Sequence, residues 1–124
     1  MNIEHINISA PKAQVKELKE FYCEIFQFKE GYRPQIPEPG HWLYDGDVPL
    51  IHLMERNERQ PLENYGCFDH IAFKGEEVKN FVARLEKMNV NYRASWLAGA
   101  CMTQLFFNDP VGIPVEVNFP NEKL

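Results

Sequence analysis

The first half of the chain combines one helical run of apolar residues with several strand-like runs. Apolar side chains recur at helical spacing within residues 10–28, at Val15, Leu18, Phe21, Tyr22, Ile25 and Phe26. Ser9 and Pro11 are its expected start signals, because a serine oxygen can accept from free backbone N–H groups and proline has no N–H to lose. Alternating or apolar runs at 3–9, 28–34, 41–46 and 48–54 predict strands. This half therefore predicts the order βαβββ.

The second half repeats that order. A strand pattern at 68–73 is followed by a helical pattern at 75–89, with Val78, Phe81, Val82, Leu85 and Met88 on one face. Runs at 90–96, 103–109 and 113–119 predict three more strands, and the stretch DPVG before the last of them predicts a turn. We therefore expect one domain over 1–124, with module 1 at about 1–55, a polar connection at about 56–66 and module 2 at about 67–124.

Aligning the two halves also aligns their unusual residues. The stretch HINI at His5 matches HIAF at His70. His52 follows His5 by 47 positions (52 minus 5), and Glu116 follows His70 by 46 (116 minus 70). Each half thus carries a polar residue in its first strand and another in its fourth, where the pattern is otherwise apolar. If the two modules curve around one concave face, four ligand-type side chains can converge there.

These four side chains are of the kinds that bind divalent metals. Three imidazoles and one carboxylate suit Fe, Mn, Ni, Zn or Co in a site that keeps positions open for substrate or water. Taken singly, each histidine could instead be a hydrogen-bonded strand residue, and Glu116 could lie on an exposed sheet face. Their coincidence with the repeat favours metal binding by His5, His52, His70 and Glu116. Coordination would also offset the cost of burying a carboxylate.

Composition excludes several classes of protein. The net charge of −5 and the scattered 13 lysines and arginines argue against a nucleic-acid partner. No apolar run approaches the ~20 residues that span a membrane, and the start MNIEHINIS does not resemble a signal peptide. Three separated cysteines, Cys23, Cys67 and Cys101, are typical of reduced thiols. We therefore expect a cytoplasmic protein with no membrane partner.

At these motifs the sequence resembles the vicinal oxygen chelate superfamily, which includes glyoxalase I, extradiol dioxygenases, and fosfomycin- and bleomycin-resistance proteins. The resemblance covers nearly the whole chain and rests on HINI, HIAF, LIHL and DPVGIPVEVNF. It implies an α+β fold of two βαβββ modules that form a cupped, mixed-sheet half-barrel around a divalent metal. It also implies a homodimer, with metal sites shared between chains or modules.

The resemblance does not settle the reaction. Glyoxalase I usually has a glutamate where this chain has His52, which leaves Glu116 or a metal-bound hydroxide to take a proton. Extradiol dioxygenases carry a tyrosine where this chain has Phe106, and the stretch WLAGACMTQ offers no acid–base histidine. Fosfomycin-resistance proteins have a basic residue after the metal-binding glutamate, for which only Lys123 is available here. Bleomycin-binding members lack the metal ligands.

Two hypotheses from different classes remain, beside a third possibility, a degenerate paralogue that keeps a metal only for stability. The first is a metal-dependent isomerase or lyase that acts on a small oxygen-bearing substrate by Lewis-acid and enolate chemistry, with Glu116 as the catalytic residue and ring-cleaving dioxygenation as an alternative. The second is a metal-independent protein that binds, or confers resistance to, a small molecule. Either would use a substrate pocket, for which the expected lining residues are Trp42, Tyr44, Trp96 and Gln104.

Overall fold

A computed structural model describes residues 2–58 and 67–124. The chain divides into two compact units, 1–61 and 62–124. Most of the predicted connection, residues 59–66, lies outside the described part, so the division of the chain into a connection and two modules of one domain stays a prediction. None of the described helices is long and apolar enough to cross a membrane.

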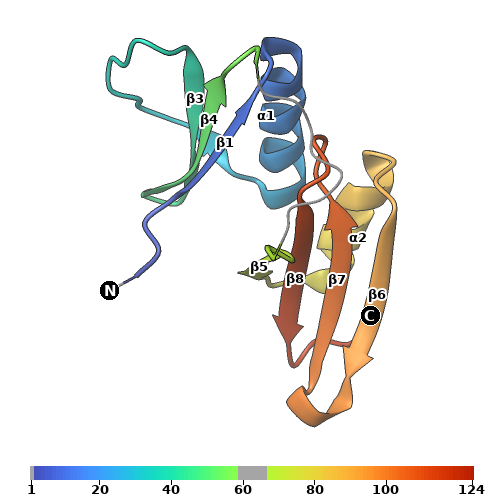
Figure 1. Cartoon of the computed structure of the whole chain (residues 1–124). Helices are drawn as coiled ribbons and strands as arrows, with labels where there is room; N and C mark the ends of the chain where they lie inside the picture. Colours follow the sequence, from blue (N-terminus) through green and yellow to red (C-terminus); the bar gives the residue numbers. More distant parts are fainter. Residues whose placement is uncertain (1, 59–66) are drawn as a thin grey trace. The chain divides into compact units, whose positions relative to one another are not determined.

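The first unit has one helix against one face of a four-stranded sheet (Figure 1). Its elements are β1 (Ile6–Ala10), α1 (Lys12–Phe26), β2 (Lys29–Glu30), β3 (Gly40–Asp45) and β4 (Val48–Glu55). The strand order is β1-β4-β3-β2, in which β1 runs parallel to β4 and the other neighbours are antiparallel. The predicted apolar face of α1 is buried, together with Leu43, Ile51 and Leu53 of the sheet.

The second unit repeats this arrangement. Its elements are β5 (Ile71–Lys74), α2 (Val78–Lys87), β6 (Tyr92–Leu97), a short 3₁₀ turn (Ala98–Ala100), β7 (Met102–Asn108) and β8 (Pro114–Pro120). The strand order is β5-β8-β7-β6, again with one parallel pair, β5 and β8. The predicted α+β class and the two βαβββ modules are therefore confirmed. The cupped half-barrel and the dimer stay predictions.

Two details of the first unit differ from the sequence prediction. Ser9 does not cap α1: it belongs to β1, which pairs with β4 as far as Ala10, and its hydroxyl donates to Asn7 Oδ1 instead. Pro11 occupies the position before the helix. The strand predicted at 28–34 is reduced to Lys29–Glu30. Just beyond β2, the backbone N–H of Gly31 still donates to the carbonyl oxygen of Trp42 (3.1 Å), and the ring of Tyr44 lies so close that a Cβ at Gly31 would meet it at 2.7 Å.

The DPVG turn positions the last strand. Asp109 is buried, and its Oδ1 accepts hydrogen bonds from the backbone N–H groups of Val111 (3.0 Å) and Ile113 (2.9 Å). Gly112 adopts a φ of 89°, which side-chain-bearing residues rarely adopt. The turn thus fixes where β8 begins, and with it which side of the sheet Glu116 faces.

Candidate functional site

The second unit brings His70 and Glu116 together. His70 directly precedes β5, and Glu116 lies in β8, the strand that pairs with β5 in parallel. His70 Nε2 is 3.0 Å from Glu116 Oε2. The neighbours Val115 and Val117 are buried on the helix side, so Glu116 faces the opposite side, yet it is only 7% exposed. A carboxylate so little exposed needs a charged or coordinating partner.

The second ring nitrogen of His70 is also occupied. His70 Nδ1 lies 2.6 Å from Asp69 Oδ1. This hydrogen bond raises the pKa of His70 above that of a free imidazole, and the charge of Glu116 acts in the same direction. A carboxylate on the far nitrogen of a histidine is the usual arrangement around metal-binding imidazoles, because it orients the ring and makes its other nitrogen a better donor.

The second carboxylate oxygen of Glu116, Oε1, accepts a hydrogen bond from Gln104. Its Nε2 donates to Glu116 Oε1 (2.9 Å) and to Asn118 Oδ1 (3.1 Å). All three side chains lie on one face, because Gln104 in β7 pairs with Asn118 in β8, two positions from Glu116. The carboxylate is thus fixed on one side by Gln104 and on the other by His70.

In the first unit, His52 lies between two parallel rings. His5 directly precedes β1, and Trp42 pairs with His52 across β3 and β4. The ring centroids of His5 and His52 are 3.9 Å apart, with 13° between the ring planes. Those of Trp42 and His52 are also 3.9 Å apart, with 5° between the planes. The stack therefore brings together two of the predicted metal ligands and one predicted pocket residue.

His52 is buried and has an unused nitrogen. Only 7% of the residue is exposed, and no partner accompanies its Nε2 in the part of the chain that the structure describes. Burial lowers the pKa of His52, and the nearby charge of His5 lowers it further. The imidazole is therefore neutral near pH 7, the form in which histidine binds metals. A buried ring nitrogen without a hydrogen bond fits a missing ligand better than a structural role.

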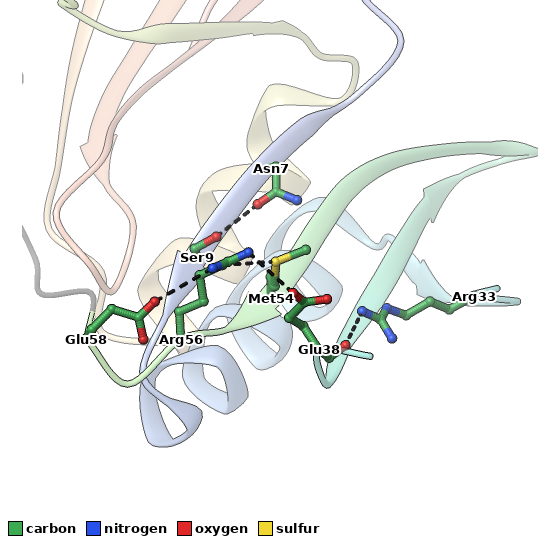
Figure 2. Close-up of polar contacts among 7 residues, drawn as sticks. All are labelled: Asn7, Ser9, Arg33, Glu38, Met54, Arg56 and Glu58. Atoms are coloured by element: carbon green, nitrogen blue, oxygen red, sulfur yellow. Dashed lines mark hydrogen bonds and ion pairs between the residues drawn. The ribbon is translucent and has the colours of Figure 1, made fainter. Parts of the chain in front are cut away.

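Figure 2 shows a polar cluster of the first unit in which Arg56 is paired with two carboxylates. Arg56 lies 3.7 Å from carboxylate oxygens of both Glu38 and Glu58, and its Nε lies 3.3 Å from Met54 Sδ. Arg33 donates from Nη2 to the carbonyl oxygen of Glu38 at 2.6 Å. The charge of Arg56 is thus balanced within this unit.

Two of the predicted pocket residues, Tyr44 and Trp96, make contacts within their own units. Tyr44 donates its hydroxyl to the carbonyl oxygen of Tyr32 (2.6 Å). Trp96 pairs with Thr103, a residue of the buried, helix-facing side, whereas Gln104 lies on the side of Glu116. Trp96 and Gln104 therefore lie on opposite faces of their sheet, so they do not line one pocket within this unit.

The predicted metal ligands appear as two pairs, His5 with His52 and His70 with Glu116. Across residues 2–58 and 67–124, no group of three or more histidine, cysteine, aspartate and glutamate side chains gathers in a way that could hold a metal ion. The sequence analysis missed Asp69 and Asn118. The stretch FDH contains the signal for Asp69, while Asn118 is recognisable only from the pairing of β7 with β8.

Comparison with protein-family models finds a match over nearly the whole chain. Residues 2–117 match the model of the Glyoxalase/Bleomycin resistance protein/Dioxygenase superfamily. A curated relative, Glyoxylase I 4 from Arabidopsis thaliana, is 27% identical over 123 residues, which cover 94% of this chain and 69% of the relative.

Solved structures share the fold. A glyoxalase family protein from Bacillus anthracis has a TM-score of 0.76 at 21% identity, with 97% of this chain and 95% of that chain covered. A single-residue variant of the fosfomycin resistance protein FosX from Listeria monocytogenes has a TM-score of 0.73 at 18% identity, with 96% of this chain and 92% of that chain covered. That FosX variant was solved with Mn(II) and 1S,2S-dihydroxypropylphosphonic acid.

Proposed function

Because the chain belongs to the Glyoxalase/Bleomycin resistance protein/Dioxygenase superfamily, we propose that it is a divalent-metal-dependent enzyme acting on a small oxygen-bearing organic substrate. The proposed reaction is an isomerisation or a lyase step, during which enolate-like negative charge develops on an oxygen of the substrate. The observation that carries the proposal is the contact of His70 Nε2 with the buried carboxylate of Glu116, at 3.0 Å.

The donor set fits a divalent metal. We propose His5, His52, His70 and Glu116 as its ligands and Fe, Mn, Ni, Zn or Co as its identity. Two observations support the fit: the buried, unpartnered Nε2 of His52, and the bond from His70 Nδ1 to Asp69. When bound, the metal would polarise a substrate oxygen as a Lewis acid. The Mn(II) of the FosX variant is consistent with this choice.

The protein side chains would supply orientation and proton transfer. Glu116 is the proposed catalytic residue, which takes the proton from the substrate carbon and returns it. The hydrogen bond from Gln104 Nε2 fixes the orientation of its carboxylate before substrate arrives. Trp42 covers His52 on one face and excludes water from it. Gln104 and Trp42 are thus proposed to border the substrate in their respective units.

The proposal is tested by turnover with and without metal. Chelator-treated and metal-reconstituted protein are assayed against an epoxide such as fosfomycin, a glutathione hemithioacetal and a catechol. Turnover of the epoxide or the hemithioacetal only by the reconstituted protein, and its loss in Glu116→Gln but not in Glu17→Gln, supports the proposal. Glu17 is an exposed residue of α1. Equal turnover by apo and reconstituted protein would refute it.

Two alternatives give different results in the same assay. Oxygen uptake with catechol, dependent on Fe(II), would indicate a ring-cleaving dioxygenase. Ligand affinity unchanged by chelator, with no turnover, would indicate a small-molecule binding or resistance protein, which the stacked rings of Trp42 and His52 could also serve. We also propose that the protein is a homodimer, which light scattering after size-exclusion chromatography tests.

A further inference from the structure

Three residues of the second unit lie side by side on the face of Glu116. Arg93 of β6 pairs with Phe106 of β7, and Phe106 pairs with Glu116 of β8. Residues directly opposite each other in neighbouring strands share a sheet face. Strands are spaced by about 4.8 Å, so the backbones of Arg93 and Glu116 are separated by about 10 Å. A small organic molecule can span that distance.

The guanidinium of Arg93 lies over the ring of Phe106, the residue between Arg93 and Glu116 on this face. Its Cζ lies 4.2 Å from the ring centroid of Phe106, which is a cation–π distance. Arg93 is exposed, and among the described residues it forms no ion pair and donates no hydrogen bond. Contact with the ring orients the charged group, while its N–H donors stay available. The arginine is thus held in place by an interaction that leaves its hydrogen-bonding capacity free.

Arg93 and the predicted metal ligand His70 both line a surface depression of about 520 Å³. Asp69, Asn91, Phe106 and Asn108 are among its other lining residues. Asp69, the acidic member, already bonds to His70 Nδ1. Arg93 is the one arginine or lysine among the described residues that line this depression, and its guanidinium can attract an anion there.

We propose that Arg93 binds an oxyanion of the substrate, a carboxylate or phosphonate, and thereby makes the substrate of the proposed enzyme an anionic small molecule. This role rests on the proposed function, in which the other end of the substrate lies at His70 and Glu116. A guanidinium matches both oxyanions with two parallel N–H···O bonds, so the two share one recognition chemistry. Phe106 would keep the guanidinium aligned and contact the carbon chain of the substrate.

The test uses methylphosphonate and acetate as probes on the chelator-treated whole chain. Binding is followed by NMR through the Nε–Hε signals of the arginines. We expect saturable movement of the Arg93 signal in the wild-type protein, with the stronger response identifying the preferred oxyanion. Absence of movement with both probes would overturn the proposal without reference to any variant.

Variants then separate recognition from folding. Arg93→Met should weaken binding by about tenfold or more, since a charge-assisted hydrogen bond is lost. Arg93→Lys, which keeps the charge but not the two-pronged geometry, should weaken it less. Arg84→Met is the matched control, because Arg84 lies over Phe81 of the buried helix face at 5.3 Å, outside this depression. Equal affinity of wild type and either Arg93 variant would contradict the assignment.

Manganese binding separates the oxyanion role of Arg93 from the metal-dependent function on which it rests. Mn(II) affinity, measured by electron paramagnetic resonance, should be the same in wild type and in Arg93→Met. If the wild-type protein binds the probe through Arg93 but binds neither Mn(II) nor any other of the proposed metals, the metal-dependent function fails while the oxyanion role stands. If it binds Mn(II) and no probe, the oxyanion role fails alone.

Discussion

The imidazole of His52 lies parallel to the indole of Trp42, with the two ring centroids 3.9 Å apart. The other face of His52 is covered by His5 at the same centroid distance. A metal-binding imidazole has to be held in one orientation, and two stacked rings achieve that without using either of its nitrogens. Trp42 is therefore a positioning residue for the proposed ligand His52.

Replacing Trp42 should weaken metal binding. Residues that orient a metal-binding side chain without touching the metal typically contribute about 10- to 100-fold to metal affinity. Trp42→Ala should therefore bind metal about tenfold more weakly, while Trp42→Phe should keep most of the affinity. Competition with a coloured chelator measures the effect. Trp96→Ala serves as the control, because Trp96 lies on the helix side of the other unit. Unchanged affinity in Trp42→Ala would show that the stack does not position His52.

Replacing Gln104 should destabilise the fold through Glu116. Gln104→Leu leaves Glu116 Oε1 without its 2.9 Å hydrogen bond in a poorly exposed position. Such a loss costs about 1–3 kcal/mol in the free energy of unfolding, which urea denaturation of the chelator-treated protein measures. Gln35→Leu, at an exposed position of the first unit, should change it little. Equal midpoints for the two variants would contradict the inferred hydrogen bond.

Glu122 caps a helix that lies far from it in the sequence. Its two carboxylate oxygens accept from the backbone N–H groups of Glu77 (2.9 Å) and Val78 (2.8 Å) at the start of α2. Glu122→Ala should therefore lower the free energy of unfolding by about 1–2 kcal/mol. Glu76→Ala removes a similar charge from the same helix end without those bonds and should cost less. If thermal or urea unfolding showed a larger loss of stability in Glu76→Ala than in Glu122→Ala, the capping role of Glu122 would be excluded.

Much of the fold follows from local periodicity. The apolar spacing of Val15 to Ile25 and of Val78 to Leu85 predicts both helices, and their buried faces match it. The end of β1 and the shortness of β2 could not be predicted, because both depend on which strand lies alongside. Likewise, nothing near Val78 indicates that the cap of α2 comes from Glu122, which is brought there by tertiary folding.

The candidate-site residues that could be predicted from the sequence are those at equivalent positions in the two halves of the chain. Matching HINI to HIAF predicted His5 and His70, and the near-equal spacing to the fourth strands predicted His52 and Glu116; each unit brings its own two residues together. Strand register decides the rest. The turn after β6 sets which residue of that strand faces Gln104, and it places Ser95 there with Trp96 on the opposite side. The contact between Arg93 and Phe106 depends on the same register and has no signal in the sequence.

A polar cluster away from the proposed ligands should make stability depend on pH. Glu30 bonds to His41 Nδ1 and, at 3.2 Å, to Lys19 Nζ. The hydrogen bond with His41 lowers the pKa of Glu30 below the usual carboxyl value. Because the unfolded state then binds this proton more readily, the stabilisation is complete above the unfolded pKa of ~4.3 and is lost as pH falls through the folded value.

Urea unfolding between about pH 5 and pH 3 tests that dependence. The free energy of unfolding of the wild-type protein should fall more steeply with acidification than that of Glu30→Gln. Glu17→Gln, which removes an exposed carboxylate of α1, should follow the wild-type slope. Parallel curves for wild type and Glu30→Gln would show that the bond to His41 adds nothing to stability.

The metal content of protein purified without an affinity tag or added metal tests the central claim most directly. We expect near-stoichiometric Fe, Mn, Ni, Zn or Co in the wild type and in the control His41→Ala, whose histidine bonds to Glu30. The metal should be lost in His70→Ala and reduced in His52→Ala. A wild-type protein that takes up no metal even after anaerobic reconstitution, or a His70→Ala variant that retains it, would contradict the account.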